Sequence, residues 1–145
     1  MRISIGSDHA GFEQKQLLAD YLAQEGHEVI DCGPDDDERV DYPDYAEAVC
    51  EKVASGHASF GVLVCGTGIG MAIAANKICG IRAANIVRED FAALAREHND
   101  ANVITLSGRF VTFDENRKIL DAFLSTSFGG GRHAGRVAKI MALEG

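Results

Sequence analysis

The sequence predicts an α/β fold in which helices cover both faces of a mainly parallel β-sheet. Short apolar runs alternate with longer stretches of helical spacing along the whole chain. The 16 glycines and 2 prolines suit tight turns between unbroken helices. The consecutive apolar residues of Gly61–Cys65 are typical of a central strand that is buried on both faces. Together these patterns indicate a wound α/β domain.

Each expected element follows from its own pattern. Five short apolar or alternating runs, ended by a turn or followed soon by one, are expected strands: Ile3–Ile5, Val29–Ile30, Phe60–Cys65, Arg82–Ile86 and Val103–Leu106. Six stretches with helical spacing are expected helices: about Gly11–Gln24, Tyr42–Ser55, Ile69–Lys77, Glu89–Glu97, Phe113–Leu124 and Arg132–Leu143. Because helices separate most consecutive strands, right-handed βαβ crossovers are expected. A chain of 145 residues with 46% hydrophobic content fits one domain, residues 1–145.

The charge distribution limits the classes of partner. A net charge of −8 argues against nucleic-acid binding and against a membrane surface, since both require a broad basic face. Residues 31–51 hold nine acidic side chains against one Arg, and Asp35–Glu38 is expected to be a solvated loop. Four arginines follow Gly108: Arg109, Arg117, Arg132 and Arg136. An acidic protein can therefore still form a local site for a small anionic partner.

The cysteines predict free thiols. Cys32, Cys50, Cys65 and Cys79 have spacings that match neither CxxC redox motifs nor paired zinc-ligand motifs, so no metal site is expected. The first residues enter an apolar strand at once, without a long apolar segment or a cleavage site. A cytoplasmic, reducing location is therefore expected.

The glycine-rich turn after Gly61–Cys65 is the strongest functional signal. In parallel α/β folds, ligands bind beyond the carboxyl ends of the strands. We expect four segments at that edge: Gly6–Gly11, Cys65–Gly70, the segment around His98, and Ser107–Arg109. Within Cys65-Gly66-Thr67-Gly68-Ile69-Gly70, backbone N–H groups can point at an anion. The same turn favours a thiolate at Cys65, a candidate general base.

Three other uses of such a turn each lack a required residue. A dinucleotide fingerprint needs G-x-G-x-x-G, but Gly70 comes one residue early. A P-loop needs Gly-Lys-Ser/Thr, which is found neither here nor at Gly6–Gly11. A phosphatase of the low-molecular-weight class would need an Arg where this chain has Met71. The remaining alternative is that Cys65 is a buried apolar side chain and the glycines only form the turn.

Three further stretches fit acid–base chemistry or anion binding. Asp8 and His9 follow the first expected strand, although Asp8 can equally be a helix cap. His98 ends the fourth expected helix; two histidines and a Cys near strand ends suit proton transfer at neutral pH, while a lone surface His usually has no role. Arg132 and Arg136 lie one helical turn apart and can grip one phosphate, unless they are only the solvated start of a helix.

Motifs along essentially the whole chain resemble one family, the type B ribose-5-phosphate isomerases, which also includes allose-6-phosphate and galactose-6-phosphate isomerases. The matching motifs are Ser7-Asp8-His9-Ala10-Gly11-Phe12, Asp41-Tyr42-Pro43, Cys65-Gly66-Thr67-Gly68-Ile69-Gly70, Ala74-Ala75-Asn76-Lys77, Gly80-Ile81-Arg82-Ala83, His98-Asn99-Asp100-Ala101-Asn102-Val103 and Gly130-Gly131-Arg132-His133. None is specific alone, but their combination and order are.

The resemblance implies a Rossmann-like three-layer sandwich with five parallel strands. It also implies a homodimer or tetramer in which the neighbouring chain completes each active site and receives the C-terminal helix. By position, Cys65 resembles the base that moves a proton between C1 and C2, and His98 resembles the acid–base group that opens the furanose ring. The positions that resemble substrate contacts are Asp8, His9, Gly66, Thr67, Gly68, Ile69, Gly70 and Asn99, and those that resemble phosphate ligands are Arg109, Arg132 and Arg136.

The expected reaction is interconversion of ribose 5-phosphate and ribulose 5-phosphate through a cis-enediolate, without a cofactor or metal. One branch of the family replaces the Cys and uses Glu at the position of Met71, so this chain resembles the branch with a thiol base. Allose 6-phosphate and galactose 6-phosphate stay open as substrates. A different class of function also stays open: a regulatory module that binds a sugar phosphate or nucleotide would not need Cys65 together with His98. A purely structural role would leave the Gly and Arg clusters unused.

Overall fold

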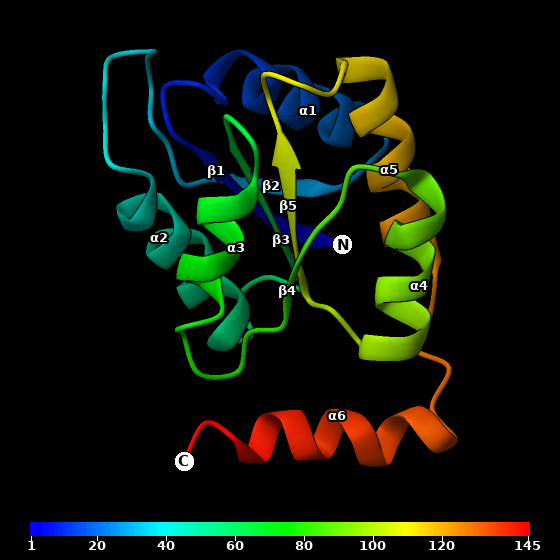
Figure 1. Cartoon of the computed structure of the whole chain (residues 1–145). Helices are drawn as coiled ribbons and strands as arrows, with labels where there is room; N and C mark the ends of the chain where they lie inside the picture. Colours follow the sequence, from blue (N-terminus) through cyan, green and yellow to red (C-terminus); the bar gives the residue numbers. More distant parts are fainter.

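The computed structural model describes residues 1–145, in which five strands alternate with six helices (Figure 1). The strands are β1 Arg2–Ser7, β2 Glu28–Asp31, β3 Phe60–Cys65, β4 Ala83–Asn85 and β5 Val103–Ser107. The helices are α1 Phe12–Gln24, α2 Tyr42–Ala54, α3 Ile69–Ala75, α4 Glu89–Asn99, α5 Phe113–Ser125 and α6 Arg132–Ala142. The elements expected from the sequence are therefore confirmed, with small shifts at their ends.

All five strands run parallel in the order β2-β1-β3-β5-β4. The apolar strand β3 lies at the centre, and its Val62 pairs with Ile5 of β1 and Ile104 of β5. Because every strand points the same way, the segments that follow β1, β3 and β5 emerge at one edge of the sheet. This parallel α/β architecture confirms the predicted fold class.

Helices cover both faces of the sheet and form two apolar cores. Helices α1, α4 and α5 enclose the larger core, in which Phe123 and Leu22 are fully buried. Helices α2 and α3 enclose the smaller core, which contains Met71 and Cys65. Each fully buried large side chain stabilises the fold by about 1.5–3 kcal/mol. Since Cys65 ends β3 within the second core, its thiol is held at the carboxyl edge of the sheet.

Helix α6 stands apart from these layers. In Figure 1 it lies along the amino-terminal edge of the sheet, where the strands begin. Val137 is its only buried residue, whereas Ile140 and Leu143 near its end are exposed. The Glu144 Oε1 atom accepts a 2.7 Å hydrogen bond from the Gly80 amide and anchors the end of this segment to the body.

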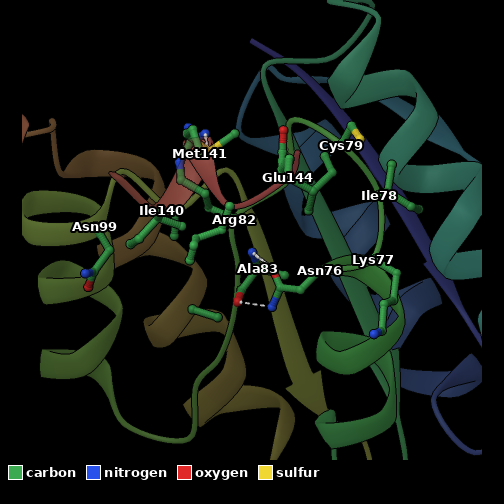
Figure 2. Close-up of a pocket in the computed structure, with 14 residues that line it drawn as sticks. Asn76, Lys77, Ile78, Cys79, Arg82, Ala83, Asn99, Ile140, Met141 and Glu144 are labelled. Carbon is green, nitrogen blue, oxygen red and sulfur yellow. Dashed lines mark hydrogen bonds between the residues drawn. The ribbon is translucent and has the colours of Figure 1, made fainter. Parts of the chain in front are cut away.

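A groove of about 600 Å³ separates the end of α6 from the loop between α3 and β4 (Figure 2). Across this loop, the Asn76 side chain bonds both the N–H and the C=O of Ala83 and so fastens edge strand β4. The groove and the exposed apolar residues of α6 leave this end of the molecule incompletely covered.

None of the six helices combines the length and the hydropathy needed to span a bilayer.

We predict that Gly11→Ala destabilises the fold by about 1–3 kcal/mol, because overpacking against backbone cannot relax by a rotamer change. A Cβ at Gly11 would lie 2.4 Å from the Val64 carbonyl oxygen of β3. Urea denaturation at fixed protein concentration measures the change. The control is Gln16→Ala on the exposed side of the same helix, expected within about 0.5 kcal/mol of the original protein. Equal stability of the two variants would contradict the prediction.

Candidate functional site

Three of the four segments expected at the carboxyl edge meet there. The turns after β1, β3 and β5 supply Asp8 and His9, the loop Cys65–Gly70, and Arg109. The Gly108 amide donates to the Cys65 carbonyl at 2.8 Å, and the Arg109 amide donates to the Gly66 carbonyl at 3.2 Å. We call this group of residues the carboxyl-edge cluster.

The loop after β3 presents free amide donors beside a thiol. Cys65 is 5% exposed, and its Sγ atom accepts a 3.1 Å hydrogen bond from the Gly68 amide. Gly68 has a φ of 84°, a left-handed conformation that favours glycine. Four N–H groups of this segment donate to no protein acceptor: those of Gly66, Thr67, Gly70 and Met71. The loop can therefore donate hydrogen bonds to an anion next to Cys65.

Arg109 places a positive charge over the same loop. Its Nη1 atom lies 3.4 Å from the position that a Cβ on Gly66 would occupy. A Cβ at Gly66 would therefore be in ordinary van der Waals contact with the guanidinium group. Arg109 is exposed and makes no ion pair within the chain, so the group is available to a ligand anion.

The first turn holds Asp8 and His9 in defined orientations. Asp8 is 7% exposed, and its Oδ1 atom accepts a 3.0 Å hydrogen bond from the Gly11 amide. This bond shapes the turn rather than capping α1, whose N-cap Gly11 has no side-chain cap. The His9 Nδ1 atom accepts from the Val40 amide at 3.3 Å, which leaves Nε2 as the N–H donor of the neutral ring.

The expectation that the segment around His98 joins the carboxyl edge is wrong. His98 lies in the last turn of α4, which leads into the start of β5 at the amino edge (Figure 1). The reason is topological: in a parallel α/β fold, a helix runs antiparallel to the strands and ends where the next strand begins. Arg132 and Arg136, at the start of α6, are exposed in this same part of the molecule.

A second group of residues forms around His98. Its ring stacks on that of His133, with centroids 4.4 Å apart and planes inclined by 17°. Asn99 is the next residue of α4, and it lines the groove between α6 and the loop that joins α3 to β4 (Figure 2). We call His98, Asn99, Arg132, His133 and Arg136 the amino-edge cluster. Sequence reasoning assigned no role to His133, although its position directly after Arg132 was an available signal.

The surroundings of His133 lower the pKa of its imidazole below the usual value of 6.5. Desolvation is the largest cause, followed by electrostatic interaction with His98, Arg132 and Arg136, while Glu97 acts in the opposite direction. Because protonation would add another positive charge here, the neutral ring is favoured. The same accumulation of positive charge favours an anion at this surface.

The other ionisable groups show no metal-binding arrangement. No group of three or more His, Cys, Asp or Glu side chains could hold a metal ion. All four cysteines are free thiols, as the sequence predicts. Burial raises the pKa of the Cys50 thiol to about 12, and burial also raises that of Cys32.

Comparison with known proteins connects this geometry to a family. Residues 3–140 match the family model described as Ribose/Galactose Isomerase. This chain belongs to that family. A probable ribose-5-phosphate isomerase B of Mycoplasma pneumoniae is 51% identical over 143 residues, covering 98% of this chain and 94% of the relative. The family named from sequence motifs is therefore confirmed.

Solved structures of family members superpose closely on this chain. The ribose-5-phosphate isomerase B of Clostridium thermocellum is 49% identical, with a TM-score of 0.98 over 99% of this chain and 97% of that chain. The enzyme of Mycoplasma genitalium, solved with bound ribulose-5-phosphate, is 47% identical, with a TM-score of 0.95 over 99% of this chain and 95% of that chain. The family architecture thus extends over nearly the whole molecule.

We predict that NMR titration gives His133 a pKa below 6.5, the usual value. The folded pKa of His133 lies below the unfolded one. The contribution of its neutral ring to the free energy of unfolding is therefore fully present above the unfolded pKa, and it declines as pH falls through the folded pKa. The variant His98→Gln should raise the His133 pKa only part of the way, since desolvation remains. A His133 pKa at or above 6.5 in the unmodified protein would contradict this description of the cluster.

Proposed function

We propose that this protein is an aldose-ketose isomerase that interconverts ribose 5-phosphate and ribulose 5-phosphate. Membership of the family and the close similarity to an enzyme solved with ribulose-5-phosphate support this substrate. Relatives named for the same reaction match the chain over almost its full length. The carboxyl-edge cluster supplies the groups that such a reaction needs.

Cys65 is the proposed base. Isomerisation through a cis-enediolate requires one group that removes a proton from C2 of the open-chain aldose and returns it to C1. The negative charge that develops on the sugar oxygens needs hydrogen-bond donors already in place. The thiol of Cys65 and the free amides of Gly66, Thr67 and Gly70 lie on one turn, which supports these two roles.

The remaining residues bind and open the sugar. Asp8 and His9 are proposed contacts of the sugar hydroxyls, and His98 is the proposed acid–base group that opens the furanose ring. Asn99 is a further proposed substrate contact. Because guanidinium groups bind phosphate with several hydrogen bonds, Arg109, Arg132 and Arg136 are the proposed phosphate ligands.

The separation of the two clusters supports a site that is shared between chains. Cys65 pairs with Ser107 at the end of β5, whereas His98 precedes Val103 at its start. At about 3.3 Å per residue, β5 alone spans about 13 Å, far more than the reach of about 3 Å needed for proton transfer. This separation argues against a site in which one chain supplies both clusters. We therefore propose that the amino-edge cluster of a second copy completes each site.

Exposed apolar side chains support a homodimer or a tetramer built from such dimers. The exposed large hydrophobic residues include Ile69 and Ile73 on α3, Phe91 and Leu94 on α4, and Ile140 on α6. An incompletely covered helix such as α6 gains stability by burying its apolar face against another chain. We propose that α6 packs on the partner and that residues 1–145 act as one catalytic domain. The four free thiols support a reducing, cytoplasmic location.

We predict that the purified protein converts ribose 5-phosphate to ribulose 5-phosphate and that Cys65→Ala lowers kcat by about 10³-fold. The loss is expected because Cys65 is the only group proposed to move the proton between C2 and C1. A coupled or colorimetric ketose assay measures the rate, and circular dichroism verifies folding. The control Cys79→Ser alters an exposed thiol and should retain activity. Full activity of Cys65→Ala would refute the role, whereas turnover of only allose or galactose 6-phosphate would change the substrate. Inactivity on all three would favour a binding module.

We predict that a mixed dimer of Cys65→Ala and Arg132→Ala/Arg136→Ala chains has about half the wild-type activity, because one of its two shared sites is intact. The two chains carry different affinity tags, and tandem purification isolates the mixed species. Alone, the double Arg variant should raise KM at least about tenfold while changing kcat less, since phosphate is a remote handle. The half activity should have the wild-type KM; residual activity with the raised KM of the double Arg variant would instead show that both clusters act within one chain.

A further inference from the structure

Two buried hydroxyl groups on β5 hold the carbonyl groups of the loop that follows Cys65. Thr105 and Ser107 lie two residues apart on the strand, so their side chains share one face of the sheet. The Thr105 Oγ1 atom donates to the Gly68 carbonyl at 2.8 Å, and the Ser107 Oγ atom donates to the Gly66 carbonyl at 2.8 Å. Both residues are almost fully buried, at 0% and 1% exposure.

These two bonds help to orient the loop amides, and the same Gly66 and Gly68 carbonyls also accept from the amides of Arg109 and Ala72, at 3.2 Å and 3.1 Å. In a trans peptide group the C=O and N–H bonds point in opposite directions. Anchoring the Gly66 carbonyl toward β5 therefore turns the Thr67 amide away from β5, where it has no protein acceptor. Anchoring the Gly68 carbonyl orients the Ile69 amide in the same way, and this amide donates to Thr67 Oγ1 at 3.1 Å.

The glycines of the loop add no conformational restraint of their own. Glycine adopts many backbone conformations, so Gly66 and Gly68 permit their peptide groups to rotate. Gly68 also supplies the amide that donates to Cys65 Sγ, so a rotation about Gly68 would disturb that bond. The position is tightly enclosed: a Cβ on Gly68 would lie 2.4 Å from Asn85 Oδ1, and this same oxygen lies 3.3 Å from Thr105 Oγ1.

Ser107 also connects the loop to the turn that carries Arg109. Its Oγ atom accepts a 3.0 Å hydrogen bond from the Phe110 amide while donating to Gly66. Its carbonyl accepts from Asn116 Nδ2 at 2.9 Å, and Asn116 in turn bonds Gln14, which donates to the Gly108 carbonyl. The glycine loop and the Arg109 turn are thus fastened to one rigid strand end.

We propose that Thr105 and Ser107 are positioning residues that orient the Gly66–Ile69 peptide groups toward the developing oxyanion and the Cys65 thiol. This inference rests on the role given above to the Cys65 loop. The hydroxyls touch no reacting atom and act through the backbone of the loop. The alternative is that they only satisfy buried carbonyl groups and contribute to stability alone.

The test compares Thr105→Val, which keeps the shape but removes the hydroxyl, with Thr105→Ser, which keeps the hydroxyl. We expect Thr105→Val to lower kcat on ribose 5-phosphate by about 10- to 100-fold, because misplaced oxyanion donors cost transition-state stabilisation. KM should change by less than about threefold, since ground-state binding relies on other contacts. Thr105→Ser should retain most of the wild-type kcat. Ser107→Ala provides an independent variant and should lower kcat in the same direction.

A matched control separates positioning from stability. Thr112→Val removes the hydroxyl that caps α5 and accepts from the Glu115 amide, at a place outside the loop. It should lower Tm, as Thr105→Val does, but leave kcat within about twofold. If Thr105→Val and Ser107→Ala lower Tm while kcat stays within about twofold, the positioning role is wrong.

A second readout works without turnover. The rate at which iodoacetamide alkylates Cys65, followed by peptide mass spectrometry across pH, reports on the thiolate. Thr105→Val should lower this rate at neutral pH, because the Gly68 amide that donates to Cys65 Sγ is less well held, whereas Thr105→Ser and Thr112→Val should leave the rate unchanged. If the unmodified protein fails to isomerise ribose 5-phosphate, the proposed function fails, but this profile still tests the positioning role. An unchanged alkylation profile in Thr105→Val would overturn the positioning role. If that variant does not fold, Ser107→Ala takes its place in this measurement.

Discussion

Parallel pairing of β3 with β1 and β5 is the constraint on which the rest of the structure depends. It brings three strand ends to one edge, so that Asp8, Cys65 and Arg109 lie together although they are far apart in the sequence. Both faces of the sheet must then be covered by helices, because β3 is apolar on each side. The same pairing sends every crossover helix back to the opposite edge, and α4 therefore delivers His98 there.

The carboxyl edge combines flexible loop glycines with rigid supports. Glycine at position 68 permits the left-handed turn, and β5 removes the freedom that glycine introduces by binding the loop carbonyls. The Gly68 amide is thereby available to the Cys65 thiol, and neighbouring amides of the loop have no protein acceptor. Such preorganised donors stabilise developing charge without reorganisation during the reaction. Precision at this site thus depends on a strand that need not contact the substrate.

The amino edge has the opposite character. Its positive charges and stacked histidines lie beside an incompletely covered helix and a groove lined by Arg82, Asn99 and Met141 (Figure 2). Nothing within the chain neutralises Arg132 or Arg136. An apolar surface next to uncompensated charge suits a second copy of the chain together with an anionic ligand, the arrangement proposed above for a shared site.

The sequence by itself determined the strands, the helices, the parallel α/β class, the family and the cluster around Cys65, because apolar periodicity and glycine-rich turns are local patterns. It did not by itself place His98 correctly, although the expected helix Glu89–Glu97 already ends beside this residue and a crossover helix ends at the amino edge. Nor could it single out Thr105 and Ser107, which read as ordinary strand residues until β5 pairs with β3 and brings their hydroxyls under the loop. Tertiary structure decided the contacts of Thr105 and Ser107 because hydrogen bonds across 37 and 41 residues form only after the sheet has assembled.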